Sequence, residues 1–392
     1  MTIHVARCLL LVVCPVLLAS AQDITFPPVA AVQAQGQIQI PQLLGQTKQD
    51  DEVFKFAGLT TYANLPWVHC LSSQEDIERY DIGILGAPFD TGTTARPGAR
   101  FGPSGIRWGS RRIASSFAYN AYTHENHFKS WARIVDCGDA PLTFLDNTVA
   151  LKQLGQAHKV VSDRPANSTD KSSVPRIIVL GGDHTTTLAA LRSTIDHWGP
   201  VSVVHFDSHI DTWDPKVLGG GLSHYAGVNH GTFLHLAHEE GLLLNNTSIH
   251  AGIRAPAINK HHDWRNDARC GFTIITARDI DHVGISGIIS RIKSRVGSTS
   301  TYISVDIDVL DPAYAPGTGT AEVGGWTTRE LLSILDGLGG QEDGVRVIGG
   351  DVVEVAPAYD NAGETTVLAA AEVVSSLIGL MVERPVQSEK DS

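Results

Sequence analysis

From about residue 52 onward, short apolar runs alternate with longer amphipathic stretches. Helix-like segments, for example 185–197 and 363–382, lie between several of the runs. Continuous apolar strands separated by helices are typical of a parallel sheet that is covered on both faces. No internal repeat or linker divides the pattern, so we predict one α/β domain over residues 52–384 and a polar tail over 385–392. The predicted strands are 81–88, 176–181, 201–206, 248–252, 272–276, 301–309 and 345–355.

The first 21 residues have the features of a secretory signal peptide. Arg7 precedes an apolar stretch, 8–19, and Ala19-Ser20-Ala21 fits the small-residue pattern of a cleavage site before Gln22. A stretch of this length is too short to span ~30 Å of hydrocarbon as a helix, and no later stretch looks long and apolar enough. An uncleaved anchor or a buried helix is the alternative. We expect a protein of the secretory pathway that is extracellular and not held in a membrane.

Composition and charge exclude several classes of protein. Apolar residues make up 42% and charged residues 18% of the 392 residues, which excludes a disordered chain. The formal net charge of −12 gives no basic surface for nucleic acid, and it is compatible with a small cationic substrate. Residues 22–51, rich in Gln and Pro, have little helical or strand period, and we interpret them as an N-terminal extension.

The cysteines leave the number of disulfides open, whereas glycosylation sequons add to the expectation of secretion. Cleavage would leave Cys70, Cys137 and Cys270, too few for a disulfide scaffold. One disulfide with one free thiol and three buried thiols both remain open. Acceptor sequons for glycosylation begin at Asn167, Asn245 and Asn246. Together with the signal peptide, they lead us to expect a glycoprotein.

Four polar clusters come at or just beyond predicted strands, where functional residues of parallel sheets gather. If the chain stays extended, Asp207, His209 and Asp211 point the same way, as do Asp306 and Asp308. Burying such carboxylates without compensation is very costly, and a bound cation is the simplest compensation. The alternative is a set of unrelated polar caps. The clusters are 181–184, 205–211, 304–308 and 351–354.

Two histidines and four aspartates of these clusters form a mixed nitrogen and oxygen ligand set. Four carboxylates balance two divalent ions, and bridging carboxylates hold such ions ~3.5–4 Å apart. Hard oxygen ligands with some imidazole suit Mn²⁺, and the lack of cysteine among them argues against a thiolate zinc site. We therefore predict two Mn²⁺ per subunit. The predicted ligands are His184, Asp207, His209, Asp211, Asp306 and Asp308.

These motifs resemble those of the arginase/agmatinase (ureohydrolase) family. The resemblance covers roughly residues 75–380 and implies a three-layer α/β/α sandwich around an eight-stranded parallel sheet. It also implies a two-manganese site that hydrolyses a guanidinium to urea and an amine. The matching text is Gly-Gly-Asp-His at 181–184, Phe-Asp-Ser-His-Ile-Asp at 206–211, Ser-Val-Asp-Ile-Asp-Val-Leu-Asp-Pro at 304–312 and Asp-Val-Val-Glu-Val-Ala-Pro at 351–357, with Pro-Phe-Asp-Thr-Gly-Thr-Thr-Ala-Arg-Pro at 88–97 as a further signature.

The resemblance implies a role for each site residue. One manganese would be held by His184 and Asp211, the other by His209 and Asp308, and both by Asp207 and Asp306. A hydroxide between the ions would be the nucleophile. Glu354 would pair with the planar guanidinium. His230, in Asn-His-Gly-Thr, would shuttle a proton to the leaving amine, with His224 as the alternative.

Residues 310–320 and the Phe-Asp-Thr-Gly-Thr signature look more like agmatinases and guanidinobutyrases than arginases. Agmatine, giving urea and putrescine, is the substrate we expect first. The alternatives are 4-guanidinobutyrate, giving 4-aminobutyrate, and a non-catalytic secreted protein on the same fold. We expect contacts to the far end of the substrate in loop 212–229, with Lys216 or Arg278 as candidates to pair with a carboxylate. We also expect a homo-oligomer, no nucleic-acid partner and no membrane partner.

Overall fold

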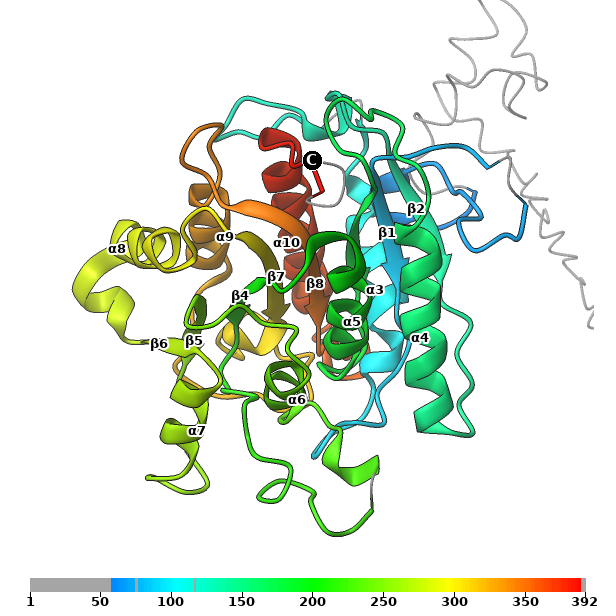
Figure 1. Cartoon of the computed structure of the whole chain (residues 1–392). Helices are drawn as coiled ribbons and strands as arrows, with labels where there is room; N and C mark the ends of the chain where they lie inside the picture. The colour runs from blue at the N-terminus through cyan, green and yellow to red at the C-terminus, as the bar shows by residue number, and fades with distance from the viewer. Residues whose placement is uncertain (1–57, 75–76, 116–117, 224, 389–392) are drawn as a thin grey trace, which may run out of the picture. The chain divides into compact units, whose positions relative to one another are not determined.

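The computed structural model describes residues 58–74, 77–115, 118–223 and 225–388 (Figure 1). Within these ranges, parallel strands form one eight-stranded sheet in the order β2-β1-β3-β8-β7-β4-β5-β6. The predicted signal peptide, the extension, His224 and residues 389–392 of the polar tail lie outside the described residues. The strands are β1 (Ile82–Gly86), β2 (Ile134–Asp139), β3 (Arg176–Leu180), β4 (Ser202–Phe206), β5 (Ser248–Ile253), β6 (Phe272–Thr276), β7 (Ser300–Asp306) and β8 (Arg346–Val353).

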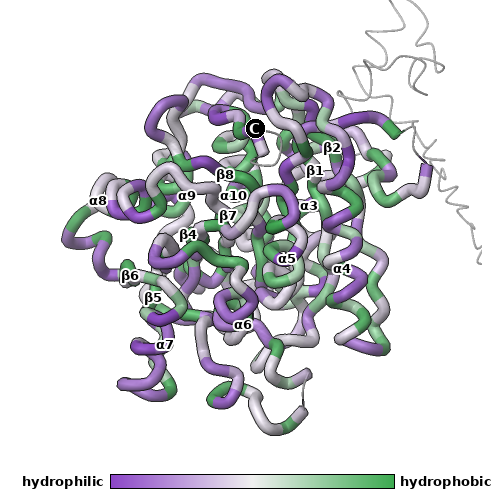
Figure 2. Tube along the Cα trace, viewed as in Figure 1, coloured by the Kyte–Doolittle hydropathy of each residue, from purple (hydrophilic) through white to green (hydrophobic). Residues whose placement is uncertain are grey.

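Helices cover both faces of this sheet, which confirms the predicted three-layer α/β/α sandwich. The core on one face includes Ile178 and residues of α3, α8, α9 and α10, whereas Val179 packs with α4, α5 and α6 on the other. Hydrophobic residues gather along the central strands, and α7 is mainly hydrophilic (Figure 2). The helices are α3 (Gly102–Gly109), α4 (Asn147–Ser162), α5 (Thr186–Trp198), α6 (Phe233–Glu239), α7 (Asp263–Arg269), α8 (Asp279–Val296), α9 (Thr328–Gly337) and α10 (Thr365–Glu383).

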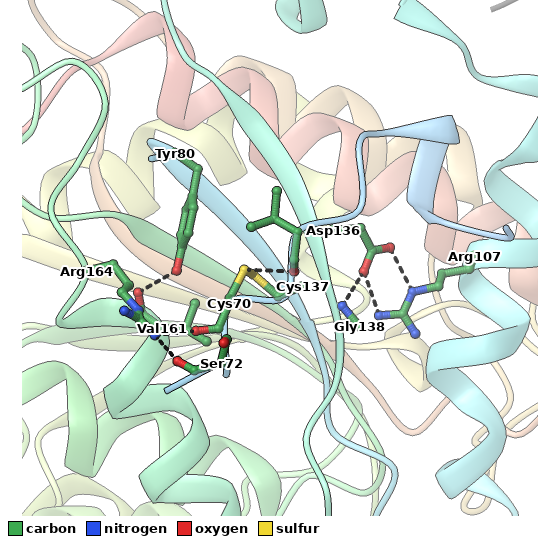
Figure 3. Close-up of a disulfide and its surroundings, with 10 residues drawn as sticks. Cys70, Ser72, Tyr80, Arg107, Asp136, Cys137, Gly138, Val161 and Arg164 are labelled. Carbon is green, nitrogen blue, oxygen red and sulfur yellow. Dashed lines mark hydrogen bonds and ion pairs between the residues drawn. A yellow bond between two sulfur atoms is a disulfide. The ribbon is translucent and has the colours of Figure 1, made fainter. Parts of the chain in front are cut away.

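Strand β2 has no counterpart among the seven predicted runs. Its sequence, Ile-Val-Asp-Cys-Gly-Asp, contains two aspartates in six residues, so its apolar run is too short to be noticed. The carboxylate of Asp136 is buried, and the Arg107 guanidinium donates to it at 2.8 and 3.0 Å (Figure 3). A buried charge needs such a partner, and the local sequence pattern does not reveal it.

The segment that precedes β1 covers the outer edge of β2. Asp136 donates its backbone N–H to the carbonyl oxygen of Pro66 at 3.0 Å. A disulfide joins Cys70 to Cys137 (Figure 3), and Cys270 is a free, buried thiol. Of the two alternatives that the sequence left open, one disulfide with one free thiol is therefore correct. Because an unpaired edge strand invites pairing with another chain, this cover protects β2.

Helix α10 contradicts the prediction that no stretch after the signal peptide is long and apolar enough to cross a membrane. It has 19 residues, and its most apolar window has a mean hydropathy of 1.8. However, 72% of that window is buried inside the protein, where Ala370 and Leu377 belong to the core. Packing against the sheet therefore accounts for the apolar character of α10, as it does for a core helix of a globular protein.

The four predicted polar clusters meet at one edge of the sheet. They lie at the carboxyl ends of β3, β8, β7 and β4, and these four strands are consecutive neighbours in the sheet. Since all the strands are parallel, their carboxyl ends lie on the same side. The topology thus gathers residues that are far apart in the chain, such as His184 and Glu354, which are separated by 170 positions.

Candidate active site

His184 lies at the centre of a first group of carboxylates. It follows β3, and its ring is fully buried. Its Nδ1 atom is 3.1 Å from Oδ2 of Asp207, 3.2 Å from Oδ2 of Asp211 and 3.3 Å from Oδ2 of Asp306. One imidazole nitrogen and three carboxylate oxygens at these separations can hold one divalent cation.

His209 forms a second group with Asp207 and Asp308. Its Nδ1 atom is 3.1 Å from Oδ2 of Asp308 and 3.3 Å from Oδ1 of Asp207. Asp207 therefore directs one carboxylate oxygen to each histidine, which is the arrangement of a bridging ligand. All six predicted ligands come together, although Asp306 lies closest to the first group.

The hydrogen bonds around His184 leave its Nδ1 atom free to bind a cation. Its Nε2 atom is 2.8 Å from Oγ of Ser304, which lies 2.6 Å from the Asp351 carboxylate. Because the hydroxyl donates its proton to that carboxylate, it accepts one from Nε2, and Nδ1 keeps its lone pair. Nδ1 of His184 and Oδ2 of Asp207 are buried without a hydrogen-bond partner. Two such acceptors 3.1 Å apart fit a bound cation.

The acidic side chains of the site repel one another. Burial raises the pKa of Asp306 well above its ordinary value, and the charges of Asp308 and Asp207 raise it further. Burial, and then the charge of Asp207, raise the pKa of Asp211 to about 6. Divalent cations would relieve this repulsion, so the electrostatics of the site agree with the binuclear metal centre that its donor atoms fit.

Backbone turns, rather than strand alternation, bring the ligands together. The extended conformation expected for 207–211 does not hold, because Asp211 has a φ of +51°. Asp308 lies in the short helical turn Ile307–Val309 instead of in β7. Glu354 also has a positive φ, +60°. Left-handed conformations of non-glycine residues cost about 1 kcal/mol or more each, and they persist where the surrounding contacts fix them.

His205 was not among the predicted ligands, yet it belongs to the first group. Its Nε2 atom is 3.0 Å from Oδ2 of Asp207. Its Nδ1 atom is 2.8 Å from Nδ1 of His250, whose Nε2 atom is 2.9 Å from the Asp267 carboxylate. The sequence signal that could have identified His205 is its two-residue spacing from Asp207, because residues at this spacing lie on the same face of an extended chain.

His230 and Glu354 are in direct contact beside this cluster. Nδ1 of His230 is 3.0 Å from Oε1 of Glu354, which also accepts the backbone N–H of His184 at 2.9 Å. Oε2 of Glu354 is buried and has no hydrogen-bond partner. Burial lowers the pKa of His230, but the Glu354 carboxylate outweighs it, and the pKa rises to about 9. The rival histidine, His224, lies outside the described residues.

Thr94, which the sequence analysis did not single out, holds the other nitrogen of His230. Its backbone N–H lies 3.1 Å from Nε2, and its hydroxyl oxygen lies 2.8 Å from the same atom. The backbone can only donate, whereas the hydroxyl can also accept. Nε2 therefore has a partner whether or not it carries a proton, as is needed in a group that transfers one. Thr94 is part of the signature motif at 88–97, but nothing in that motif marked it as a partner of a histidine.

Asp183 fixes the loop that carries Thr94. Its carboxylate accepts the backbone N–H of Gly92 at 2.6 Å and that of Thr185 at 2.9 Å. A Cβ atom at Gly92 would lie 2.2 Å from Oγ1 of Thr185, so this close approach requires glycine. Burial and the charge of Glu354 raise the pKa of Asp183 to about 7. Asp183 is therefore a structural link and not a ligand.

A cleft that is partly open to solvent leads to the cluster. The predicted substrate loop contributes Trp213 and Leu218 to its wall, whereas Lys216 and Arg278 do not line it. Glu354 is buried and is not among the lining residues, but it contacts His230, which is one of them. The lining residues are Thr94, His209, Asp211, Trp213, Leu218, His230, Gly231, Ala255, Pro256, Ile258, Asp306, Thr320 and Glu322.

Known proteins are similar to this chain in sequence and in architecture. Residues 80–379 match the arginase family. The chain is 51% identical over 354 residues to a Schizosaccharomyces pombe protein named "Putative agmatinase 1", covering 88% of this chain and 87% of that protein. It is 35% identical over 308 residues to agmatinase from Proteus mirabilis, covering 78% and 88%. The structure of proclavaminate amidinohydrolase from Streptomyces clavuligerus has a TM-score of 0.71 and 32% identity, covering 84% of this chain and 99% of that chain.

Proposed function

Because the chain belongs to the arginase family, we propose that it hydrolyses agmatine to urea and putrescine. It is an agmatinase-like ureohydrolase. The observation that carries the proposal is the buried cluster of His and Asp ligands beside Glu354, whose Oε2 is a free acceptor. Agmatinases among the relatives support agmatine as the substrate, and 4-guanidinobutyrate is the alternative that carries the same reacting group.

The metal-binding roles follow the two groups of donor atoms. Two imidazoles and four carboxylates, with no thiolate, are the donor set that suits Mn²⁺. When bound, the two ions supply Lewis-acid activation of a water and balance the carboxylate charges. One ion would be held by His184 and Asp211, the other by His209 and Asp308, and both by the carboxylate of Asp207. Asp306, whose Oδ2 atom faces the first group, receives the second bridging role from the family resemblance.

Glu354 and His230 act on the substrate in this proposal. Oε1 of Glu354 is occupied by His230 and by the backbone of His184, which leaves Oε2 to accept an N–H of the guanidinium. His230 lines the cleft and contacts Glu354, so it can deliver a proton to the departing amine. One residue thus orients the reacting group, and the other supplies the proton that its cleavage requires.

Urea release by the purified, manganese-loaded protein tests this function. Agmatine, 4-guanidinobutyrate, 3-guanidinopropionate and arginine are compared, and agmatine should give the highest kcat/KM. Glu354→Gln should weaken binding and turnover while both metals remain. Glu342→Gln, on the exposed surface, is the matched control and should keep wild-type activity. If none of the compounds releases urea, the proposed function is wrong.

We also propose that the protein is exported after cleavage before Gln22. The Cys70–Cys137 disulfide supports this, because disulfides persist in oxidising compartments. The asparagines of all three sequons are exposed, so they are accessible to glycosylation. N-terminal sequencing of protein from the native host should find Gln22 first, and deglycosylation should lower the apparent mass; residues 1–21 intact on that protein would contradict export.

We further propose a homo-oligomer. The side chains of Phe144 and Leu145 are 79% and 84% exposed, and adjacent exposed apolar residues favour association. Light scattering of the purified protein gives the mass directly. Replacing both residues by serine should lower that mass if they lie in the interface, and a monomeric wild type would contradict the proposal.

A further inference from the structure

The described lining of the cleft includes acidic side chains but no lysine or arginine. Two of the acids, Asp211 and Asp306, point into the cluster of ligand atoms. The third, Glu322, is about one third exposed, and its Oε1 atom lies 3.8 Å from Nε2 of His209. That separation is too long for a hydrogen bond, so the Glu322 carboxylate remains available to a ligand.

The arginine nearest to this wall is fully engaged elsewhere. Arg254 donates to the carbonyl oxygen of Glu322 at 2.7 and 3.2 Å and to the carbonyl oxygen of Asp308 at 2.6 Å. Its Nη1 group donates to the carbonyl oxygens of Gly252 and Val309, and Nη2 also lies 3.2 Å from the carbonyl oxygen of Leu310. The guanidinium therefore shapes the wall and has no donor left for a substrate carboxylate. Among the described residues of the cleft lining, the negative end of a guanidino acid would find no lysine or arginine side chain.

The chain segment that carries Glu322 passes close to the buried Glu354 carboxylate. A Cβ atom on Gly319 would lie 3.5 Å from Oε2 of Glu354, so the chain at Gly319 borders the guanidinium position. Glu322 follows three residues later, and three residues span at most about 10 Å. The two nitrogen-bearing ends of agmatine lie roughly 7 Å apart when extended, given bonds of about 1.5 Å. One substrate can therefore reach both carboxylates.

We propose that Glu322 binds the ammonium group at the far end of the substrate, so that the cleft selects a dicationic guanidino amine over a guanidino acid. The apolar side chains of Trp213, Leu218 and Ile258 line the cleft and would contact the methylenes between the two charges. This inference rests on the proposed ureohydrolase function and adds the residue that sets its substrate class. The Glu322 carboxylate would attract the ammonium group of agmatine and repel the carboxylate of 4-guanidinobutyrate, so agmatine is the favoured substrate.

Three substrates that differ only at the far end test the role of Glu322: agmatine, 1-butylguanidine and 4-guanidinobutyrate. In Glu322→Gln, kcat/KM for agmatine should fall about 3- to 5-fold, the size of a partly exposed ion pair, chiefly through KM. The value for 1-butylguanidine, which has no charge there, should stay within about twofold, because no ion pair is lost. Glu322→Lys should reverse the preference towards 4-guanidinobutyrate. Glu342→Gln, an exposed acid outside the cleft, is the control.

An equal loss for all three substrates, or no loss for agmatine, would overturn the role of Glu322. Metal analysis of Glu322→Gln should find wild-type content, because loss of metal would mean that the carboxylate positions His209 instead. If the wild type releases no urea, the proposed function fails separately. Calorimetric titration of agmatine and 1-butylguanidine into the wild type and Glu322→Gln then tests ammonium binding without turnover, and equal affinities in the two proteins would reject it.

Discussion

The Nδ1 atom of His230 lies 3.0 Å from Oε1 of Glu354, although 124 residues separate the two in sequence. This contact occupies one oxygen of the carboxylate and leaves the other buried and without a partner. It also gives the imidazole an anionic partner that stabilises its protonated form. Proton delivery and guanidinium binding are thus coupled through one carboxylate, and substitutions can separate the two contributions.

Replacing His230 by asparagine should affect catalysis far more than substrate or metal binding. A positioned acid–base group contributes ~10²–10⁴-fold to the rate, so kcat should fall by that range. Metal content and KM should remain close to wild type, because His230 is outside both ligand groups. Steady-state kinetics with elemental analysis give both readouts. If His224→Asn abolishes turnover while His230→Asn is nearly silent, the proton role belongs to His224.

Thr94→Val should move the pH dependence of turnover. Valine keeps the shape of the side chain and the backbone N–H, but it removes the oxygen that can accept a proton from Nε2 of His230. The protonated imidazole loses a partner, so its pKa should fall and the alkaline limb of the kcat profile should shift to lower pH. The loss in kcat should be smaller than in His230→Asn, roughly tenfold, since one hydrogen bond is removed. Thr94→Ser should restore the wild-type profile, and an unshifted Thr94→Val profile would show that the hydroxyl has no part in the transfer.

The buried strands could be predicted because both faces of a central strand are covered, which gives a continuous apolar run such as that of β3. Strand β2 could not be predicted in this way, because the partner that allows Asp136 to be buried, Arg107, lies 29 residues away. The sequence pattern also did not predict the order of the strands in the sheet. Pairs such as Ile178 and Gly350 join distant parts of the chain, and the local pattern carries no information about them.

The grouping of the six proposed ligands could be predicted because carboxylates that follow apolar strands are costly to bury unless they bind a cation. Thr94 and Glu322 were missed in the sequence, because neither the residue type nor the spacing of these two residues is unusual. Thr94 became a candidate partner of His230 only through a contact across 136 residues. Glu322 follows the quoted 310–320 stretch, but its position on the cleft wall depends on how Arg254 holds that segment. Such roles arise from tertiary proximity, which residue type and spacing do not reveal.

Asp207→Asn should remove more metal than Asp211→Asn. Asp207 has one oxygen near each ligand histidine, whereas Asp211 belongs to the first group alone. Loss of a bridging charge weakens both ions, so Asp207→Asn should retain less than one ion per chain after desalting, and Asp211→Asn should retain about one. Asp170→Asn, on the exposed surface, should keep both ions. Equal metal content in the two site variants would remove the bridging assignment from Asp207.

Loss of the disulfide should lower the stability of the folded chain by about 4 kcal/mol, as expected for a cross-link that closes a loop of 67 residues. The double variant Cys70→Ser, Cys137→Ser should therefore unfold at a lower urea concentration than the wild type. Reductant should produce a similar shift in the wild type and none in the double variant. Cys270→Ser keeps the cross-link and should retain the sensitivity to reductant. Insensitivity of the wild type to reductant would show that the bond is not formed in solution.

His158 should make the protein less stable in mild acid. Burial lowers its pKa to about 4, with a further lowering by His197, and neither ring nitrogen has a hydrogen-bond partner. An unfolded histidine titrates near 6.5, so between about pH 6.5 and 4 the unfolded state binds the extra proton and stability falls as pH falls. From pH 7.5 to 5.0, the wild type should lose about 2 kcal/mol that His158→Leu does not lose. Urea denaturation at both pH values measures this difference. His261→Gln, which removes an exposed histidine, is the control and should keep the wild-type pH dependence. If the free energy of unfolding changes equally with pH in His158→Leu and in the wild type, the protonation of His158 is not linked to folding.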